Sequence, residues 1–452
     1  MCPLRRSAAL VLFSLMVACG SLSAFPSPLR FAADPSWEGK TVIIAKHGTR
    51  LMQTKPGGVD EPGVVLTRTD YTVLKDEGER IWLRQTNIEG WIPRTAAVPL
   101  ADAADFFTKA LEKTPNDVQL LARRSKAHEL KGDLDKAIAD YDEALRVQPQ
   151  NPSWINNRAN LFNKKRDYDR ALKDYDEALR LNPNSAIITQ NRGNAWLNKR
   201  EFDKAIDDYT RALELDANYP LPWVNRGNAW REKREYDKAL KDLSEALRLD
   251  PKLPFAYTQR GAVWLAKKES DKALADHEEA IRLDRKSAPA FYNRGCLWLE
   301  RNEFERAIWD FDHALWLEPR LANAQAQRGN VRREKREFNL ALKDYSATLK
   351  EDGNNVIALA GKALLLASCP DEKFRDGKQA LELATKACEL TKHRNPDYVA
   401  VLAAAHAEAG QFAEAVKLLR QALEDAEYAR DHGADGKKRL KLFERERIYR
   451  QE

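Results

Sequence analysis

The sequence predicts a mainly α protein, in which a small β-barrel precedes an α-solenoid of helix-hairpin repeats. The first observation is a repeat, because an arginine recurs every 34 residues at Arg158, Arg192, Arg226, Arg260, Arg294 and Arg328. The second is that short β-rich runs are confined to residues 34–98. The third is composition. With 32% charged and 43% apolar residues, the chain has many solvated faces and a thin core, which disfavours a compact α/β enzyme or a polytopic membrane protein.

Residues 1–24 have the pattern of an export signal. Arg5 and Arg6 precede an apolar run at 8–18 that is too short to anchor stably in a bilayer. Three outcomes stay open: cleavage after Ala24, cleavage at a lipobox-like stretch with lipidation of Cys19, or an uncleaved anchor. All three predict an exported protein of the bacterial periplasm or cell envelope, which contacts the membrane through this signal or a lipid anchor alone.

The cysteines indicate neither a disulfide framework nor a zinc site. Beyond Cys2 and Cys19 in the leader, the chain has Cys296, Cys369 and Cys388, without a CxxC pair or a histidine at ligand spacing. A Cys369–Cys388 disulfide and free thiols both stay open, and the helical register favours the thiols because it puts this pair near opposite ends of a hairpin.

The segment 34–98 alternates short β-rich runs with Gly, Pro and Asp clusters, which is typical of a small antiparallel barrel. Trp82, followed by Gly90, Trp91, Ile92 and Pro93, resembles the last two main strands of bacterial SH3-like domains. That resemblance implies a module that binds peptides or cell wall, or one that is merely structural. Trp37, Trp82 and Trp91 are accordingly either core residues or a ligand-stacking face.

Each 34-residue unit contains two amphipathic helices. We number the positions of a unit from 1, with units beginning at 118, 152, 186, 220, 254, 288 and 322. Position 8 is Gly or Ala from the second unit on, where the partner helix crosses, and position 20 is Ala in every unit. Position 27 is Ala in the first six units, and positions 11 and 24 are mostly aromatic. Position 32 is Pro at Pro149, Pro183, Pro251 and Pro319, where it stops the second helix, with Ala217 and Arg285 in two of the other units. His277 at position 24 and Arg332 at position 11 depart from this pattern, as does Ser270, so we expect their layers to be the loosest.

These positions resemble the tetratricopeptide repeat consensus, and the resemblance implies a right-handed solenoid with a concave groove lined by the first helices. Seven regular repeats are expected over 118–355, after a capping helix at 101–117. An inserted loop at 369–375 breaks the register, so 356–424 is expected to hold two degenerate repeats. Residues 425–452 are expected to form a basic capping helix, with 437–450 as its helical part; a contact with membrane or nucleic acid is the alternative.

The resemblance places positions 2, 5, 6, 9, 12 and 13 in the groove, and amides dominate positions 6 and 9. A ladder of amides offers donors and acceptors to a peptide backbone, similar to the asparagine ladder of O-GlcNAc transferases. The family's carboxylate clamp is not matched, since position 5 lacks Lys. An alternative also stays open: these amides are solvent-exposed surface residues without a binding role, which recur only because the repeat was duplicated. The candidate peptide-binding residues are Asn157, Asn160, Asn191, Asn194, Asn225, Asn228, Gln259, Asn293, Gln327 and Asn330.

The arginine at position 7 is interpreted as structural, with its stem along the neighbouring helix and its head paired with acids between repeats. No GxSxG, P-loop, HExxH or GxGxxG motif occurs, so we expect no enzyme, no cofactor and no metal site. The 75 basic and 69 acidic residues nearly balance, which argues against a nucleic-acid partner. We therefore expect an exported scaffold that binds proteins or extended peptides. The alternative is an adaptor whose barrel binds peptidoglycan peptides while the array recruits an envelope enzyme.

Overall fold

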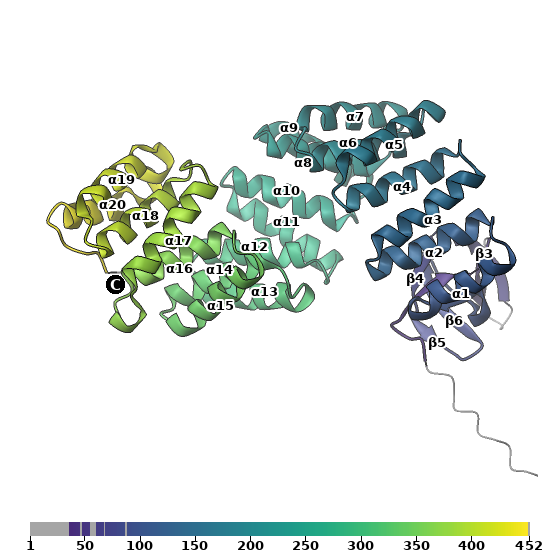
Figure 1. Ribbon diagram of the computed structural model, residues 1–452, viewed down its shortest axis with the longest axis horizontal. Helices are drawn as coiled ribbons and strands as arrows, with labels where there is room; N and C mark the ends of the chain where they lie inside the picture. Colours follow the sequence, from purple (N-terminus) through teal and green to yellow (C-terminus); the bar gives the residue numbers. More distant parts are fainter. Residues whose placement is uncertain (1–35, 46–47, 55–59, 67, 86–87, 451–452) are drawn as a thin grey trace, which may run out of the picture. The chain divides into compact units, whose positions relative to one another are not determined.

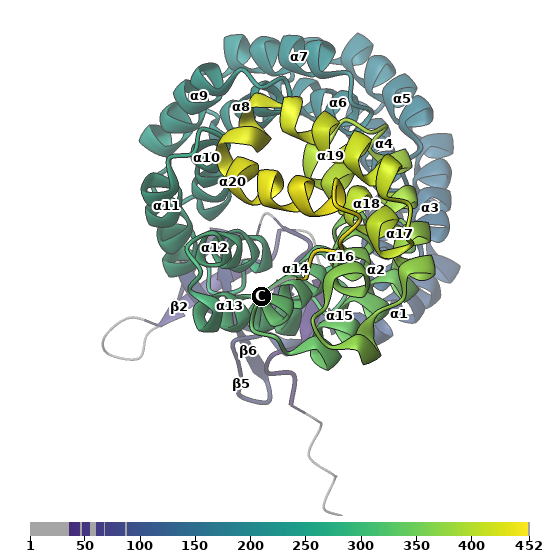
Figure 2. The same cartoon turned by 90° about the vertical axis from the view of Figure 1, so that its left-hand side faces the viewer.

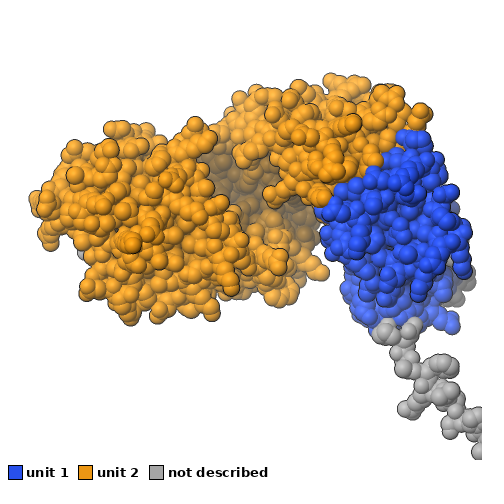
Figure 3. Space-filling view, in the orientation of Figure 1, with its two compact units in different colours: residues 1–149 blue, residues 150–452 orange. Residues whose placement is uncertain are grey.

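A computed structural model of the chain describes residues 36–45, 48–54, 60–66, 68–85 and 88–450 (Figure 1). The predicted export signal, including Cys19, lies outside the described residues. The chain divides into two compact units, residues 1–149 and 150–452, shown in different colours in Figure 3. Within the described part, no helix has the length and apolarity needed to cross a bilayer.

The N-terminal strands form two antiparallel sheets. One has the order β4-β1-β8 and the other the order β3-β2-β7-β6-β5. Their core includes Val42, Leu51, Ile81, Leu83 and Ile92, all fully buried. The strands are β1 (Thr41–Ile44), β2 (Arg50–Thr54), β3 (Asp60–Val65), β4 (Asp70–Thr72), β5 (Lys75–Asp76), β6 (Arg80–Gln85), β7 (Ile88–Pro93) and β8 (Ala97–Pro99).

A small antiparallel β domain is thus confirmed, but its sheets do not close into the expected barrel. β3 and β5 stay at the edges of the five-stranded sheet. A barrel closes only when its two edge strands pair with each other. β5 is only two residues long, and Pro62 in β3 has no backbone N–H to donate, so these edges are poorly suited to pairing.

The tryptophans of the β domain lie outside the fully buried core. Trp82 and Trp91 are directly opposite each other on β6 and β7, and both are half-buried. Because side chains alternate along a strand, burial of Ile81 and Leu83 puts Trp82 on the other face of the sheet. Trp37 packs against the edge of the core, where the guanidinium of Arg94 lies 4.1 Å from its ring centroid. The interpretation of all three as core fillers is therefore wrong for Trp82 and Trp91.

The helical region consists of consecutive hairpins in which first and second helices alternate. In Figure 2 the first helices α4 to α12 lie on the inner side of a ring and the second helices α5 to α13 on its outer side. The helices are α1 (Leu100–Lys113), α2 (Val118–Lys131), α3 (Leu134–Val147), α4 (Pro152–Lys164), α5 (Tyr168–Leu181), α6 (Ala186–Asn198), α7 (Phe202–Leu215), α8 (Pro220–Glu232), α9 (Tyr236–Leu249), α10 (Pro254–Ala266), α11 (Ser270–Leu283), α12 (Ala288–Glu300), α13 (Phe304–Leu317), α14 (Ala322–Glu334), α15 (Phe338–Glu351), α16 (Val356–Ser368), α17 (Gly377–Leu390), α18 (Pro396–Glu408), α19 (Phe412–Glu424) and α20 (Ala426–Phe443).

The first helices begin at the predicted starts of the repeats, and local chemistry explains why. Side chains of Asn151 and Ser185 accept hydrogen bonds from the first-turn amides of α4 and α6, which caps these helices. Pro152, Pro220 and Pro254 occupy the first helical position, where a missing N–H costs nothing.

The hairpin turn requires a left-handed residue at position 15. Gly132 takes this conformation in the first repeat, with φ of 87°. In the next six repeats the residue is Arg166, Arg200, Arg234, Lys268, Asn302 or Arg336, with φ between 58° and 66°. Residues other than glycine are strained in this region, so the turn geometry is imposed by the packing of the two helices.

The small residue at position 8 lets the two helices of a hairpin approach closely. A Cβ added at Gly193 would lie 2.8 Å from the ring of Tyr209, and one at Gly295 would lie 2.8 Å from the ring of Phe311. Both aromatic rings are fully buried. The pairing of a small residue with a bulky ring, expected from the sequence, is therefore the packing unit of the array.

In the fifth repeat His277 takes the place of the aromatic ring. It is 0% exposed, and neither ring nitrogen has a hydrogen-bond partner among the described residues. Burial lowers the pKa of His277 to about 4. In the seventh repeat Arg332 donates to Asp344 at 2.8 Å. The looser packing expected of both layers stays a prediction about stability.

The C-terminal region follows the expected break in register. A short 3₁₀ turn at Glu372–Phe374 lies inside the predicted insertion, between α16 and α17. Cys369 and Cys388 are buried free thiols, which fits the reduced alternative.

The last helix differs from its expected limits of 437–450. Asp425 accepts hydrogen bonds from the amides of Glu427 and Tyr428, so α20 begins at residue 426. It ends at Phe443, and Glu446 follows with a φ of 56°. In Figure 2 this helix projects over the space that the ring of helices encloses.

Candidate binding groove of the helical array

Each hairpin of residues 150–452 that keeps the 34-residue period contains a two-pronged ion pair. The arginine at position 7 donates through Nε and Nη2 to both carboxylate oxygens of an aspartate 16 residues later, at 2.6–3.0 Å. This geometry is the strong bidentate form of the arginine–carboxylate contact. The pairs are Arg158–Asp174, Arg192–Asp208, Arg226–Asp242, Arg260–Asp276, Arg294–Asp310 and Arg328–Asp344.

The structural interpretation of these arginines is confirmed, but the main partner lies within the same hairpin rather than between repeats. Arg192 and Arg328 reach the preceding repeat as well, at Asp176 and Asp312. Burial raises the pKa of Asp208, and the hydrogen bonds from Arg192 oppose that rise. The aspartate that pairs with the arginine occupies position 23 of each of these repeats. It could have been identified from the sequence, since it recurs with the same 34-residue period.

The candidate amides lie on the inner first helices, and several bind one another. Asn191 Nδ2 donates to Asn156 Oδ1 at 3.0 Å, and Asn225 Nδ2 donates to Asn194 Oδ1 at 3.0 Å. These bonds connect successive repeats. Part of the ladder therefore stabilises the array itself, a role that the sequence analysis missed.

Position 9 also accepts a bond from the second helix. The hydroxyl of Tyr209 donates to Asn194 Oδ1 at 2.7 Å. The same contact joins Tyr175 to Asn160 at 2.6 Å and Tyr345 to Asn330 at 2.8 Å. The tyrosine at position 24 thus satisfies the amide at position 9.

This network is interrupted in the fourth and fifth repeats. Position 24 of the fourth repeat is Leu243, which has no hydroxyl, and Asn228 Oδ1 is buried without a partner among the described residues. Gln259 Oε1, at position 6 of the next repeat, is in the same state. Two neighbouring acceptors in the middle of the groove are consequently unsatisfied, and each is expected to cost about 1–3 kcal/mol.

The remaining candidates are less connected. Asn157 Oδ1 accepts a bond from Asn156 at 3.3 Å, and Gln327 Oε1 accepts one from Asn330 at 2.8 Å. Asn293 is half-buried on α12. The structure thus brings the position 6 and 9 amides onto one inner surface but leaves them unequally free to bind a ligand.

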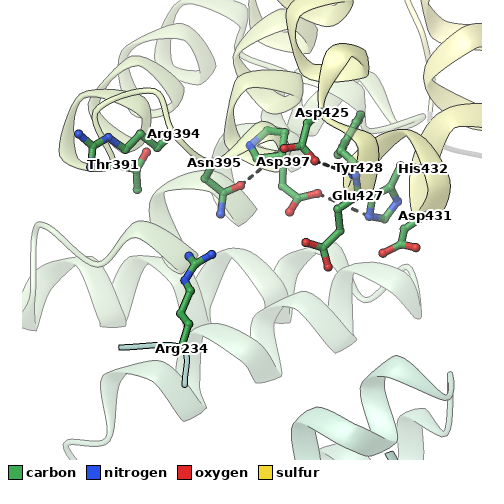
Figure 4. A pocket seen from close by; sticks show the side chains of 11 residues that line it. Arg234, Thr391, Arg394, Asn395, Asp397, Asp425, Glu427, Tyr428, Asp431 and His432 are labelled. Atoms are coloured by element: carbon green, nitrogen blue, oxygen red, sulfur yellow. Dashed lines mark hydrogen bonds and ion pairs between the residues drawn. The ribbon is translucent and has the colours of Figure 1, made fainter. Parts of the chain in front are cut away.

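The C-terminal end of the groove is enclosed by α20. A cavity of about 400 Å³ has one wall of groove-facing residues and an opposite wall that contains Tyr428, His432 and Arg439. A second cavity of about 470 Å³ lies between Arg234, in the turn before α9, and the acidic residues of α20 (Figure 4). The groove-facing residues of the first cavity are Arg333, Glu334, Leu364, Asp397, Ala400 and Val401.

The outer face of α13 has an aromatic stripe that the sequence analysis did not single out. Trp309 is 56% and Trp316 73% exposed, and the rings of Trp309 and His313 stack with centroids 5.2 Å apart. In the preceding repeat the positions of His313 and Trp316 hold the exposed ion pair Glu279–Arg282. Comparing each repeat with its neighbours would have revealed this departure.

Comparison with known proteins identifies the repeats. Family models described as tetratricopeptide repeat match residues 100–152 and 156–220, residues 220–253, and residues 400–427. The chain contains tetratricopeptide repeats. Figure 2 places the first helices α4 to α12 on the inner side of the array, where the resemblance leads us to expect a groove. Among the described residues, no group of three or more His, Cys, Asp and Glu side chains is placed to hold a metal ion.

Solved structures with a similar fold include a chain of the crystal structure of the APC/C hetero-tetramer Cut9–Hcn1. It has a TM-score of 0.53 and 15% identity, over 68% of this chain and 59% of that chain. A tetratricopeptide repeat protein from Parabacteroides merdae has a TM-score of 0.44 and 20% identity, over 53% of this chain and 95% of that chain. The human IFIT1 dimer with m7Gppp-AAAA has a TM-score of 0.48 and 16% identity, over 71% of this chain and 76% of that chain. Curated protein sequences gave no match. The first of these similarities shows the solenoid fold.

Proposed function

We propose that this protein is a non-enzymatic exported scaffold that binds proteins or extended peptides through the inner groove of its array. Tetratricopeptide repeats form scaffolds for protein–protein interaction, and the fold and family matches support that general role. The observation that carries the finer proposal is that Asn228 and Gln259 are half-buried on neighbouring first helices, and that neither amide oxygen is bonded within the described residues. A half-buried amide that is not committed to an internal bond can rotate to meet the backbone N–H and C=O groups of an extended peptide, and it binds them without selecting side chains.

The test is a comparison of amides that differ in their internal bonds. Asn228→Ala combined with Gln259→Ala removes the two amides that lack an internal bond to their oxygens, so affinity for an extended peptide should fall about tenfold or more. Asn191→Ala is the matched control, because Asn191 already donates to Asn156 and should contribute to stability instead. A peptide that binds the wild type is first selected from a random library by fluorescence. Isothermal titration calorimetry then measures its affinity for the double variant and for Asn191→Ala. Unchanged affinity in the double variant would exclude these amides as the binding site.

Export is proposed from residues 1–24, with Cys19 as the lipidation site if the lipobox is used. Intact-mass measurement on membrane and periplasmic fractions distinguishes an N-terminus at Phe25 from a diacylglyceryl Cys19. Full-length protein recovered from the cytoplasm would contradict export.

A second candidate function uses the β domain as an adaptor for peptidoglycan peptides. It is favoured by the paired tryptophans, Trp82 and Trp91, on the face opposite the core, with the guanidinium of Arg80 5.4 Å from the Trp91 ring centroid. Half-buried indoles provide a stacking surface. Co-sedimentation with purified peptidoglycan, compared between the wild type and Trp91→Ala, tests it, and equal sedimentation would exclude this face.

A further inference from the structure

The last helix occupies the place where a groove ligand would lie. The wall it faces is made of positions 2, 5, 6, 9, 12 and 13 of three successive first helices, from Arg333 to Val401. These are the positions that line the groove elsewhere in the array. Tyr428 of α20 is buried in the same apolar cluster as Leu402 and Val399 of α18, and His432 Nε2 lies 3.5 Å from Asp397 Oδ1. The array is therefore already filled at this end by a helix of its own chain.

Two ion pairs connect α20 to the middle of the array. Lys268 Nζ lies 2.7 Å from Glu427 Oε1 and 2.9 Å from Asp431 Oδ2. Lys268 is the left-handed residue of the turn between α10 and α11, 163 residues before Asp431. Glu427 and Asp431 are four residues apart, so they lie on one face of the helix. In Figure 4 both project into the gap opposite Arg234.

α20 is held weakly for its length. Of its 18 residues, the buried ones are Tyr428, Gly433, Gly436 and Phe443. Two interior glycines lower helix propensity, and exposed ion pairs contribute little net stability. Gly436 is required by packing, because a Cβ there would lie 2.9 Å from Leu423, whereas a Cβ at Gly433 would have Ala429 Cβ at 4.0 Å as its nearest neighbour.

We propose that α20 is a built-in, displaceable ligand of the groove, latched by Lys268. The external partner that takes its place is an amphipathic helix with the same pattern: two carboxylates four residues apart, with an aromatic side chain next to the first. Such a helix supplies the carboxylates that Lys268 binds and the ring that Tyr428 places against α18. This inference rests on the proposed function, because it names the partner class for the C-terminal end of the same groove.

Hydrogen exchange of the α20 amides in the full-length protein measures the latch without any ligand. Lys268→Glu should raise their exchange rate about fivefold, because two ion pairs become repulsive. Adding Glu427→Lys and Asp431→Lys restores the attraction and should return the rate toward the wild type. Gly433→Ala should lower the rate about fivefold, since alanine favours the closed helix and meets no close neighbour. Exchange that is unchanged in Lys268→Glu would overturn the latch.

A synthetic peptide of residues 425–443 then tests the site. Glu427→Lys combined with Asp431→Lys opens the latch but leaves Lys268 available, so this variant should bind the peptide about fivefold more tightly than the wild type, in proportion to its larger open fraction. Adding Lys268→Glu should abolish that gain. Glu424→Lys, an exposed acid on the preceding helix, is the control for charge and should resemble the wild type. An opened variant that does not bind the peptide would overturn the partner assignment, while the amide variants judge the proposed function separately.

Discussion

The third and fifth repeats have the same hairpin geometry but different polar interiors. Gly193 and Gly261 each let a ring approach, since an added Cβ would lie 2.8 Å from Tyr209 in one and 2.6 Å from His277 in the other. In the third repeat the ring hydroxyl satisfies Asn194, whereas in the fifth both ring nitrogens are unpartnered within the described chain. The difference shows that the repeat backbone depends on the small residue and the buried ion pair. The side chain at position 24 decides how well that backbone is stabilised.

The largest expected effect tests what the two repeats share. Asp208→Ala leaves Arg192 without its bidentate partner, and Asp276→Ala does the same to Arg260. Asp276→Ala should lower the free energy of unfolding by about 3 kcal/mol, because breaking a largely buried pair leaves an uncompensated charge. Asp208→Ala should lower it less, since Arg192 keeps its bond to Asp176. Urea denaturation followed by circular dichroism measures this loss. A large loss in one repeat and none in the other would refute the shared framework.

The next effect is specific to the fifth repeat. The pKa of His277 is lowered to about 4 in the folded protein, so the imidazole stays neutral there down to that pH. In the unfolded chain the same imidazole has its ordinary pKa of 6.5, so it binds a proton at a higher pH than in the folded protein. Stability is therefore full above pH 6.5 and should fall by about 3 kcal/mol as the pH drops to 4.

His277→Phe is the matched variant, since Phe311 fills the same position against Gly295. Melting temperatures between pH 7 and pH 4 should show a smaller decline in this variant than in the wild type. An identical decline would assign the pH dependence to other groups.

A smaller effect separates the amides of the two regions. Asn191→Ala removes an inter-repeat hydrogen bond and should cost about 1 kcal/mol of stability. Asn228→Ala removes a buried acceptor without a described partner, so stability should stay equal or rise. Thermal melts of the two single variants test this, and equal destabilisation would show that Asn228 is satisfied in solution.

The smallest effect concerns the left-handed turns. Arg200→Gly relieves the strain of a φ of 66° and should stabilise the array by about 0.5 kcal/mol after the entropy cost of glycine. Lys268→Gly relieves similar strain but removes the contacts with Glu427 and Asp431, so its net gain should be smaller. Chemical denaturation compares the two, and a larger gain at Lys268 would argue against a stabilising latch.

Much of the fold was predictable because its information is local. Proline and polar caps set the starts of first helices to the residue, with Pro152 and Pro254 as examples. The small residues at positions 8 and 20 instead set how closely the two helices of a hairpin pack. The candidate amides were expected on the inner helices because the family resemblance implies that placement. Their pairing was not predictable, since the bond from Asn225 to Asn194 joins residues 31 apart on different helices.

The period, the alternation of helices and the tetratricopeptide character follow from the amino-acid sequence alone, because side-chain size and helix propensity within one unit of 34 residues dictate them. Three outcomes arise only in the folded chain: the N-terminal sheets stay open, Asn228 and Gln259 lack partners among the described residues, and α20 reaches Lys268. Those outcomes depend on contacts between distant parts of the chain. For the contact between α20 and Lys268, small rotations from one repeat to the next add up, and no local pattern records their sum.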